Sequence, residues 1–208
     1  RNDHEKTQIF TIALDGGEAV RLGKLEGDLE ALKWSPDGTA LSVLRRQPET
    51  KKRKKMNEKY DDAVVVDGEP RFSRLFVIDA ESGKKRQVDS GNRQIWYYTW
   101  SPDSAQLAYT TAEEVGADAP MQRGDVWVSG RDGKDPRHVA QLDQTPEFPT
   151  FVTGPSGPAL AVRKNGWREH PADSVFLIDL ESGHSTNVLE EFPANVDGVA
   201  SLKDSVGA

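Results

Sequence analysis

Few residues in this 208-residue chain have the types and spacing that catalysis requires. A Gly-x-Ser-x-Gly elbow would present an activated serine at a strand-to-helix turn. The nearest sequence, at 154–158, reads Gly-Pro-Ser-Gly-Pro, so its spacing is wrong. The histidines are far apart and show no metal-ligand spacing; they are His4, His138, His170 and His184. We predict ordinary surface or loop histidines, and assign no catalytic residue, no cofactor-binding residue and no metal ligand.

Two pairs of neighbouring carboxylates, Asp61-Asp62 and Glu113-Glu114, have the charge to bind an amine. Each pair stands in a polar stretch between apolar segments, which is typical of a solvated loop. Carboxylates in such loops usually serve solubility. We therefore favour a solvated loop over an amine-binding site at both positions.

One polar stretch, residues 165–173, contains a large aromatic residue outside any strand pattern. Loops on a rigid scaffold carry binding residues disproportionately often. Trp167, Arg168 and Glu169 offer a ring and two opposite charges. We therefore name these three residues as candidate substrate-binding residues.

The basic run at 49–59 permits two interpretations. It contains Lys-Lys-Arg-Lys-Lys, which is typical of a nuclear or nucleic-acid signal. It is also typical of a solvated loop, because acidic residues flank the run and the chain has a net charge of −7. We favour the loop, and we expect no nucleic acid as a partner.

Apolar and cysteine content limit the class of protein further. No apolar run approaches the roughly 20 residues that span a bilayer, so we expect no membrane partner. The absence of cysteine excludes a disulfide framework and thiolate metal sites. Cysteine-free proteins occur in both the cytosol and the periplasm, so the compartment stays open, with the cytoplasm favoured.

A short sequence motif organises the chain. Residues 34–38 read Trp-Ser-Pro-Asp-Gly, and residues 100–104 read Trp-Ser-Pro-Asp-Ser. Proline pre-sets φ for a tight turn, and aspartate accepts hydrogen bonds from nearby backbone N–H groups. Residues after each motif alternate between apolar and polar, as in a strand. Each copy therefore predicts a hairpin, with Trp34 and Trp100 as buried core anchors.

A second signature repeats along the chain. An aromatic-centred strand runs into an Asp-Gly, Gly-Gly or Ser-Gly turn near 10–17, 76–83, 125–133 and 175–183. Phe76 and Trp127 are 51 residues apart, and Trp127 and Phe176 are 49 apart. A unit of about 50 residues with two hairpins is typical of a four-stranded propeller blade.

We therefore predict an all-β fold, with residues 1–208 forming a partial β-propeller. It would contain about three complete four-stranded antiparallel blades plus a half blade and a terminal strand. The expected complete blades are about 29–88, 95–140 and 147–189, the half blade is 8–22, and the terminal strand is 196–200. The insertions between second and third strands are 46–73, which is charged, 112–123 and 165–173.

The repeats resemble the N-terminal β-propeller of the prolyl oligopeptidase (S9) family of serine peptidases. The resemblance is strongest to its acylaminoacyl-peptidase and dipeptidyl-peptidase-like branch. The Trp-Ser-Pro-Asp-Gly motif is also shared with TolB/WD40-like propellers. The charged insertion, followed by the Val-rich run at 62–67, favours the peptidases. The matching stretches are 8–22, 34–38, 62–67, 74–83 and 100–103.

This resemblance implies a C-terminal α/β-hydrolase domain downstream, which is absent from this chain. That domain would hold the catalytic triad, and the propeller would gate and select short peptides without catalysing a reaction. No substrate-contacting residue of the family can be matched here. The alternative is a TolB-like propeller that serves as a protein-interaction module. An arc of blades leaves sheet faces uncovered, so we also expect the chain to self-associate or to be only marginally stable.

Overall fold

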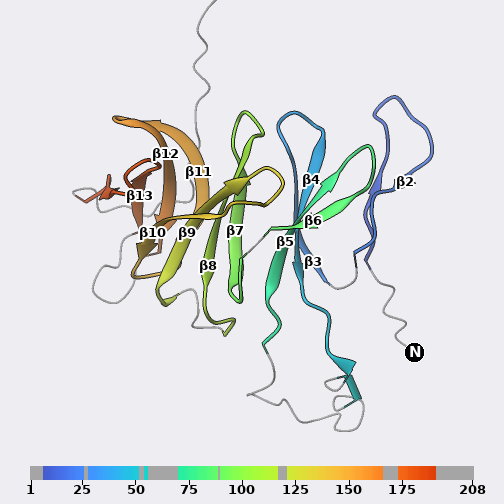
Figure 1. The fold of residues 1–208 in the computed structure, drawn as a ribbon, viewed down its shortest axis with the longest axis horizontal. Helices are drawn as coiled ribbons and strands as arrows, with labels where there is room; N and C mark the ends of the chain where they lie inside the picture. The colour runs from blue at the N-terminus through green and yellow to red at the C-terminus, as the bar shows by residue number, and fades with distance from the viewer. Residues whose placement is uncertain are drawn as a thin grey trace, which may run out of the picture. The chain divides into compact units, whose positions relative to one another are not determined.

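The computed structural model describes residues 7–25, 28–51, 54–55, 70–88, 90–116, 121–165 and 173–190. Across these residues the regular structure is almost entirely β (Figure 1). The strands form three four-stranded antiparallel sheets and one two-stranded ribbon. The predicted all-β class with four-stranded antiparallel sheets is therefore confirmed, whereas the total number of blades stays a prediction. The chain divides into two compact units, Arg1–Val88 and Asp89–Ala208.

The first unit contains the ribbon and one sheet, whose strands follow one another in chain order. The ribbon pairs β1 (Phe10–Thr11) with β2 (Val20–Arg21). The sheet consists of β3 (Leu29–Trp34), β4 (Ala40–Arg46), β5 (Ser73–Asp79) and β6 (Lys85–Gln87). Its buried core joins the segment after β2 to the two central strands. The core residues are Leu22, Leu25, Leu41, Val43, Phe76 and Ile78.

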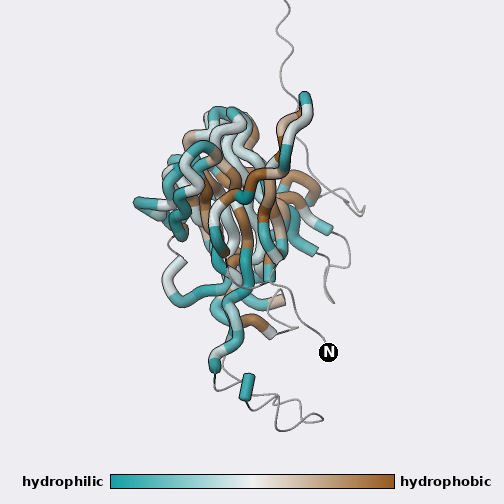
Figure 2. The backbone as a smooth tube through the Cα atoms, turned by 90° about the vertical axis from the view of Figure 1, so that its right-hand side faces the viewer, coloured by the Kyte–Doolittle hydropathy of each residue, from teal (hydrophilic) through white to brown (hydrophobic). Residues whose placement is uncertain are grey.

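The second unit contains two sheets, each again in chain order. One comprises β7 (Gln94–Trp100), β8 (Gln106–Ala112), β9 (Gly124–Gly130) and β10 (Arg137–Leu142). The other comprises β11 (Glu147–Gly154), β12 (Gly157–Lys164), β13 (Ser174–Asp179) and β14 (Ser185–Asn187). Their facing surfaces share one core, which includes Val126, Val128, Leu160, Val162 and Ile178. In Figure 2 the apolar stretches run along strands, and the hydrophilic ones gather at the connections.

The Ser-Pro-Asp motifs form the predicted tight turns. In the first copy, the Asp37 Oδ1 atom accepts hydrogen bonds from Ser35 Oγ at 2.6 Å and from the Thr39 N–H at 3.0 Å. Gly38 adopts φ 71°, and Ser104 takes the same place in the second copy with φ 61°. The aspartates therefore hold turns, as predicted.

The turns between third and fourth strands use a different aspartate. Asp79 Oδ1 accepts from the Ser82 N–H at 2.8 Å, and Asp179 Oδ1 accepts from the Ser182 N–H at 2.7 Å. The glycine that follows each serine has positive φ, 66° at Gly83 and 73° at Gly183. Because glycine adopts this conformation without a steric penalty, the Ser-Gly pair closes the turn.

The prediction that both signature tryptophans are buried was wrong for one of them. Trp100 is 7% exposed, whereas Trp34 is 49% exposed. The exposure of Trp34 follows from what covers the sheet of the first unit. Leu22 and Leu25 pack on β4 and β5, which leaves β3, the strand that ends at Trp34, largely uncovered.

Several sequence predictions fall outside the described residues. These are the Val-rich run, the terminal strand, His4, His170 and the paired Asp61-Asp62. In the part of the chain that the structure describes, no helix is long and apolar enough to cross a membrane.

Candidate functional site

A buried carboxylate lies where β11 begins. Glu147 is 6% exposed and stands opposite Arg163 in the β11–β12 register. Arg163 donates to its Oε2 atom from Nε at 3.1 Å and from Nη2 at 2.5 Å. Asn165 Nδ2 donates to the other oxygen, Oε1, at 2.7 Å. Such charge-assisted, two-pronged pairing is among the stronger polar interactions in proteins.

The neighbouring sheet contributes Tyr97, from β7. Its side chain is hydrogen-bonded to Glu147, and burial raises the pKa of the Tyr97 hydroxyl to about 12, with the Glu147 charge adding to the shift. The same carboxylate raises the pKa of the Arg163 guanidinium, chiefly through its hydrogen bond. Asp173 Oδ2 stands 3.9 Å from Arg163 Nη1 and adds a second negative charge. We call Glu147, Arg163, Asn165, Tyr97 and Asp173 the Glu147 network.

The residue after Glu147 has an unusual conformation. Phe148 adopts φ 48° and is 46% exposed. It lies in a bulge, because the register shifts between Glu147 and Thr150. Pro149 follows and has no N–H to donate to the ladder, which favours a bulge at this point. A left-handed conformation costs a non-glycine residue about 1–2 kcal/mol, so the surrounding contacts must maintain it.

Two side chains of the Glu147 network touch the Phe148 ring. The Tyr97 ring lies with its centroid 4.7 Å from that of Phe148, at an interplanar angle of 55°. The Arg163 guanidinium carbon stands 5.1 Å from the Phe148 centroid. Tilted aromatic pairs and cation–π contacts at these separations are attractive. The network therefore holds an exposed aromatic ring in a fixed place.

The chemistry open to this site is binding, because Glu147 is already engaged. Both of its carboxylate oxygens accept hydrogen bonds, and Arg163 lies between Glu147 and a second carboxylate. A general base needs a lone pair directed at the proton that it removes. The described residues of this cluster can position a ligand, but their arrangement is not that of an acid–base pair.

A second polar cluster lies in the β7–β10 sheet. The carboxylate of Asp125, on β9, is largely buried, and its Oδ1 lies 2.9 Å from both His138 Nε2 and Gln141 Nε2. Arg93 Nε lies 3.8 Å from the other oxygen. The His138 ring is part-exposed and packs edge-on against Trp127 at 5.0 Å. The sequence did not reveal this carboxylate partner, because the β9–β10 register brings Asp125 and His138 together from 13 residues apart.

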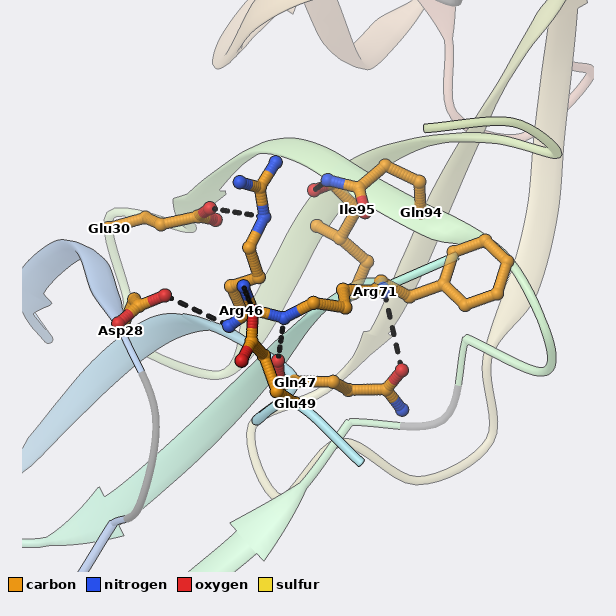
Figure 3. A network of polar contacts seen from close by, with 9 residues as sticks. Asp28, Glu30, Arg46, Gln47, Glu49, Arg71, Gln94 and Ile95 are labelled. Atoms are coloured by element: carbon orange, nitrogen blue, oxygen red, sulfur yellow. Dashed lines mark hydrogen bonds and ion pairs between the residues drawn. The ribbon is translucent and has the colours of Figure 1, made fainter. Parts of the chain in front are cut away.

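In the first unit, a polar network closes the stem of the charged insertion (Figure 3). Arg71 donates from Nη2 to Asp28 Oδ2 at 3.0 Å and from Nε to the Gln47 carbonyl at 2.7 Å. The Phe72 carbonyl accepts from the Gln47 N–H at 2.9 Å, and the Gln47 side chain accepts from the Phe72 N–H at 3.2 Å. The two ends of the β4–β5 connection are therefore joined at its base.

The candidate residues named from the sequence, Trp167, Arg168 and Glu169, lie outside the described residues. Asn165 and Asp173, the described residues nearest to these three in the sequence, belong to the Glu147 network. We did not predict Glu147, Arg163 or Tyr97 as site residues from the sequence. The available signal was Pro149, because proline within a sheet is found at edge strands, at the first residue of a strand or at bulges. Among the residues that the structure describes, no three His, Asp or Glu side chains gather to hold a metal ion.

Comparison with known proteins supports a propeller. No family model matches the chain. Dipeptidyl-peptidase 5 of Porphyromonas gingivalis is 28% identical over 118 residues, which cover 53% of this chain and 16% of that protein. The chain therefore spans less than a fifth of the length of this curated relative.

Solved structures of similar fold include a peptidase and a TolB protein. An acylaminoacyl peptidase from Pyrococcus horikoshii matches with a TM-score of 0.53 and 16% identity, over 89% of this chain and 28% of that one. TolB from Acinetobacter baumannii matches with a TM-score of 0.51 and 12% identity, over 94% of this chain and 40% of that one. At these identities the likeness shows the fold alone: this chain has a propeller-type fold like those of the acylaminoacyl peptidase and TolB.

Proposed function

We propose that this chain is the non-catalytic propeller portion of a serine peptidase of the prolyl oligopeptidase (S9) kind. Its role there is to gate and select short peptides for an α/β-hydrolase domain that follows in the same parent chain. The observation that carries the proposal is the 28% identity with a dipeptidyl-peptidase over 118 residues, combined with four-stranded sheets in chain order. The acylaminoacyl or dipeptidyl peptidase-like branch is the one that we favour.

Size selection has a plain physical basis. A folded domain of 100 residues has a radius of gyration of roughly 13 Å, whereas an extended peptide is only one strand wide. A rigid propeller over an active site would therefore admit the peptide and exclude the domain. Side chains fixed on such a scaffold, as in the Glu147 network, would then favour some peptides over others.

The experiment begins with the full reading frame. We expect a Gly-x-Ser-x-Gly sequence in a hydrolase domain after residue 208. The parent protein should cleave aminoacyl or dipeptidyl chromogenic substrates, and deletion of the propeller should increase cleavage of a folded protein substrate relative to those substrates. A fluorophosphonate probe should label the parent and leave this chain unlabelled. A frame without a hydrolase domain, or labelling of this chain, would overturn the proposal.

The alternative is a TolB-like interaction module without enzymatic activity. The observation in its favour is that TolB aligns with 94% of this chain. The two proposals predict different full reading frames, because a TolB-like protein would lack the Gly-x-Ser-x-Gly nucleophile elbow. Retrieval of a partner protein with the full-length chain, together with the absence of any labelled serine, would favour this module.

A further inference from the structure

We propose that the exposed ring of Phe148, with Tyr97 and Arg163 packed against it, is a binding site for an aromatic side chain of an extended peptide. This inference deepens the proposed function and rests on it for the choice of a peptide as the ligand. It names the feature by which the propeller would distinguish peptides.

Folding alone does not account for the exposed ring of Phe148. Its ring is 46% exposed, and its backbone has φ 48°, a conformation that phenylalanine rarely adopts. Strained residues that the surrounding structure maintains are concentrated at binding and active sites. Glycine or asparagine would fit this backbone with less strain, and neither would expose an apolar ring. The position therefore retains an aromatic ring at a cost to stability.

The Phe148 ring is rigidly placed. Glu147 precedes it and is held by Arg163, Asn165 and Tyr97. Tyr97 and Arg163 also contact the Phe148 ring itself. The Tyr97 ring centroid lies 4.7 Å from the Phe148 centroid, and the Arg163 guanidinium carbon lies 5.1 Å from it. A ring that is already ordered loses little conformational entropy when a ligand stacks on it. Aromatic residues, phenylalanine among them, and arginine are also enriched in the buried cores of interfaces.

The charged residues around Phe148 restrict the chemistry of the ligand. The Glu147 oxygens accept bonds from Arg163 and Asn165, so this carboxylate is poorly suited to hold a peptide amine. Arg163 is engaged by Glu147 and flanked by Asp173, so it is equally poorly suited to hold a peptide carboxylate. What remains accessible is the apolar part of the Phe148 ring. An aromatic side chain stacks on such a surface by dispersion and quadrupole attraction.

The test uses the 208-residue chain and two capped tripeptides, N-acetyl-Gly-Phe-Gly-amide and N-acetyl-Gly-Ala-Gly-amide, in ¹⁵N NMR titrations. We expect the phenylalanine peptide to bind about tenfold more tightly than the alanine peptide. The shifted amides should include those around Phe148. Phe148→Gly should reduce the affinity for the phenylalanine peptide by about tenfold. It should also keep the fold, because glycine accepts φ 48°.

The matched control is Leu32→Ala. Leu32 is 49% exposed on β3, and truncation of its side chain should leave peptide affinity unchanged. Equal affinity for the two peptides, or an equal effect of both variants, would overturn this inference. Peptide binding that is independent of Phe148 would leave the proposed gating function intact. A parent protein without peptidase activity would instead contradict the proposed function. The peptide-binding measurement on Phe148 would still be interpretable, because it does not depend on catalysis.

Discussion

The turn at Gly183 lies directly against the backbone of Val139. A Cβ atom added to Gly183 would stand 2.4 Å from the Val139 carbonyl oxygen, a distance that side-chain carbons do not adopt. Gly183 also has φ 73°. Since Gly183 closes the β13–β14 turn and Val139 lies on β10, this contact joins the two sheets of the second unit.

Gly183→Ala should therefore destabilise the second unit by about 2–4 kcal/mol, from left-handed strain plus a clash with backbone. Gly91→Ala is the control, because Gly91 has φ 56° and nothing within 4 Å of an added Cβ. That variant should lose only about 1 kcal/mol. Urea melts followed by circular dichroism measure both. Equal losses would mean that the turn stands away from β10.

The Glu147–Arg163 pair gives the second prediction. Removal of one partner from a buried pair leaves the other charge uncompensated, so Glu147→Ala should destabilise by about 3–5 kcal/mol. Replacement of both partners by apolar residues of similar size, Glu147→Leu with Arg163→Met, should cost much less. Chemical denaturation of the two variants tests this. If the double variant is less stable than Glu147→Ala, the pair contributes net stability beyond mutual charge compensation.

Tyr97 gives a prediction on pH. Its pKa is raised from 10.0 to about 12, chiefly by burial and then by the charge of Glu147. The folded state thus retains a proton that the unfolded state releases above pH 10. By linkage, this group's contribution to stability is fully present below about pH 10 and is lost as the pH rises from about 10 to 12.

Two measurements check the behaviour of Tyr97. In an absorbance titration at alkaline pH, Tyr97→Phe should remove a phenol transition near pH 12. The urea midpoint of the wild type should also fall more steeply than that of Tyr97→Phe between pH 10 and 11.5. A wild-type titration without any phenol that ionises above pH 11 would contradict the burial of the Tyr97 hydroxyl.

The two signature tryptophans should differ in their cost of truncation. Trp100 is 7% exposed, so Trp100→Ala should destabilise by about 3–5 kcal/mol, as expected for a buried ring. Trp34 is 49% exposed, so Trp34→Ala should cost about half as much or less. Acrylamide should likewise quench a variant that retains only Trp34 more strongly than one that retains only Trp100. A larger loss of stability for Trp34→Ala would mean that β3 is covered in solution.

What the sequence could predict was local turn chemistry and its repetition. Asp37 and Asp179 act within three residues of their own positions, so their roles can be derived from a short motif. The hairpins that these turns close are antiparallel by necessity, and apolar alternation identifies the strands between them. A four-stranded sheet in chain order follows from those two facts.

What the sequence could not predict depends on which residues meet across sheets. Trp34 and Trp100 share one motif, yet they differ in exposure because different segments cover them. Glu147 and Tyr97 lie 50 positions apart on different sheets, so no short pattern reveals their contact. The bulge at Phe148 could be predicted in part from the sequence, since Pro149 has no N–H to donate to the sheet ladder. The left-handed φ of Phe148 and its exposed ring could not be predicted.

The last prediction concerns the apolar residues that the first unit exposes. Phe10 is 55% exposed, and Ile12 and Val20 are more exposed still, at 63% and 65%. All three lie on or beside the short β1–β2 ribbon. An exposed ribbon with apolar side chains favours pairing with another chain. We therefore expect the apparent mass of the purified chain to rise with concentration in static light scattering. Phe10→Lys with Val20→Lys should shift it toward the monomer, because like charges on the ribbon oppose pairing, whereas Lys84→Gln on an exposed turn should not. A monomer mass at every concentration would show that these side chains are not sites of association.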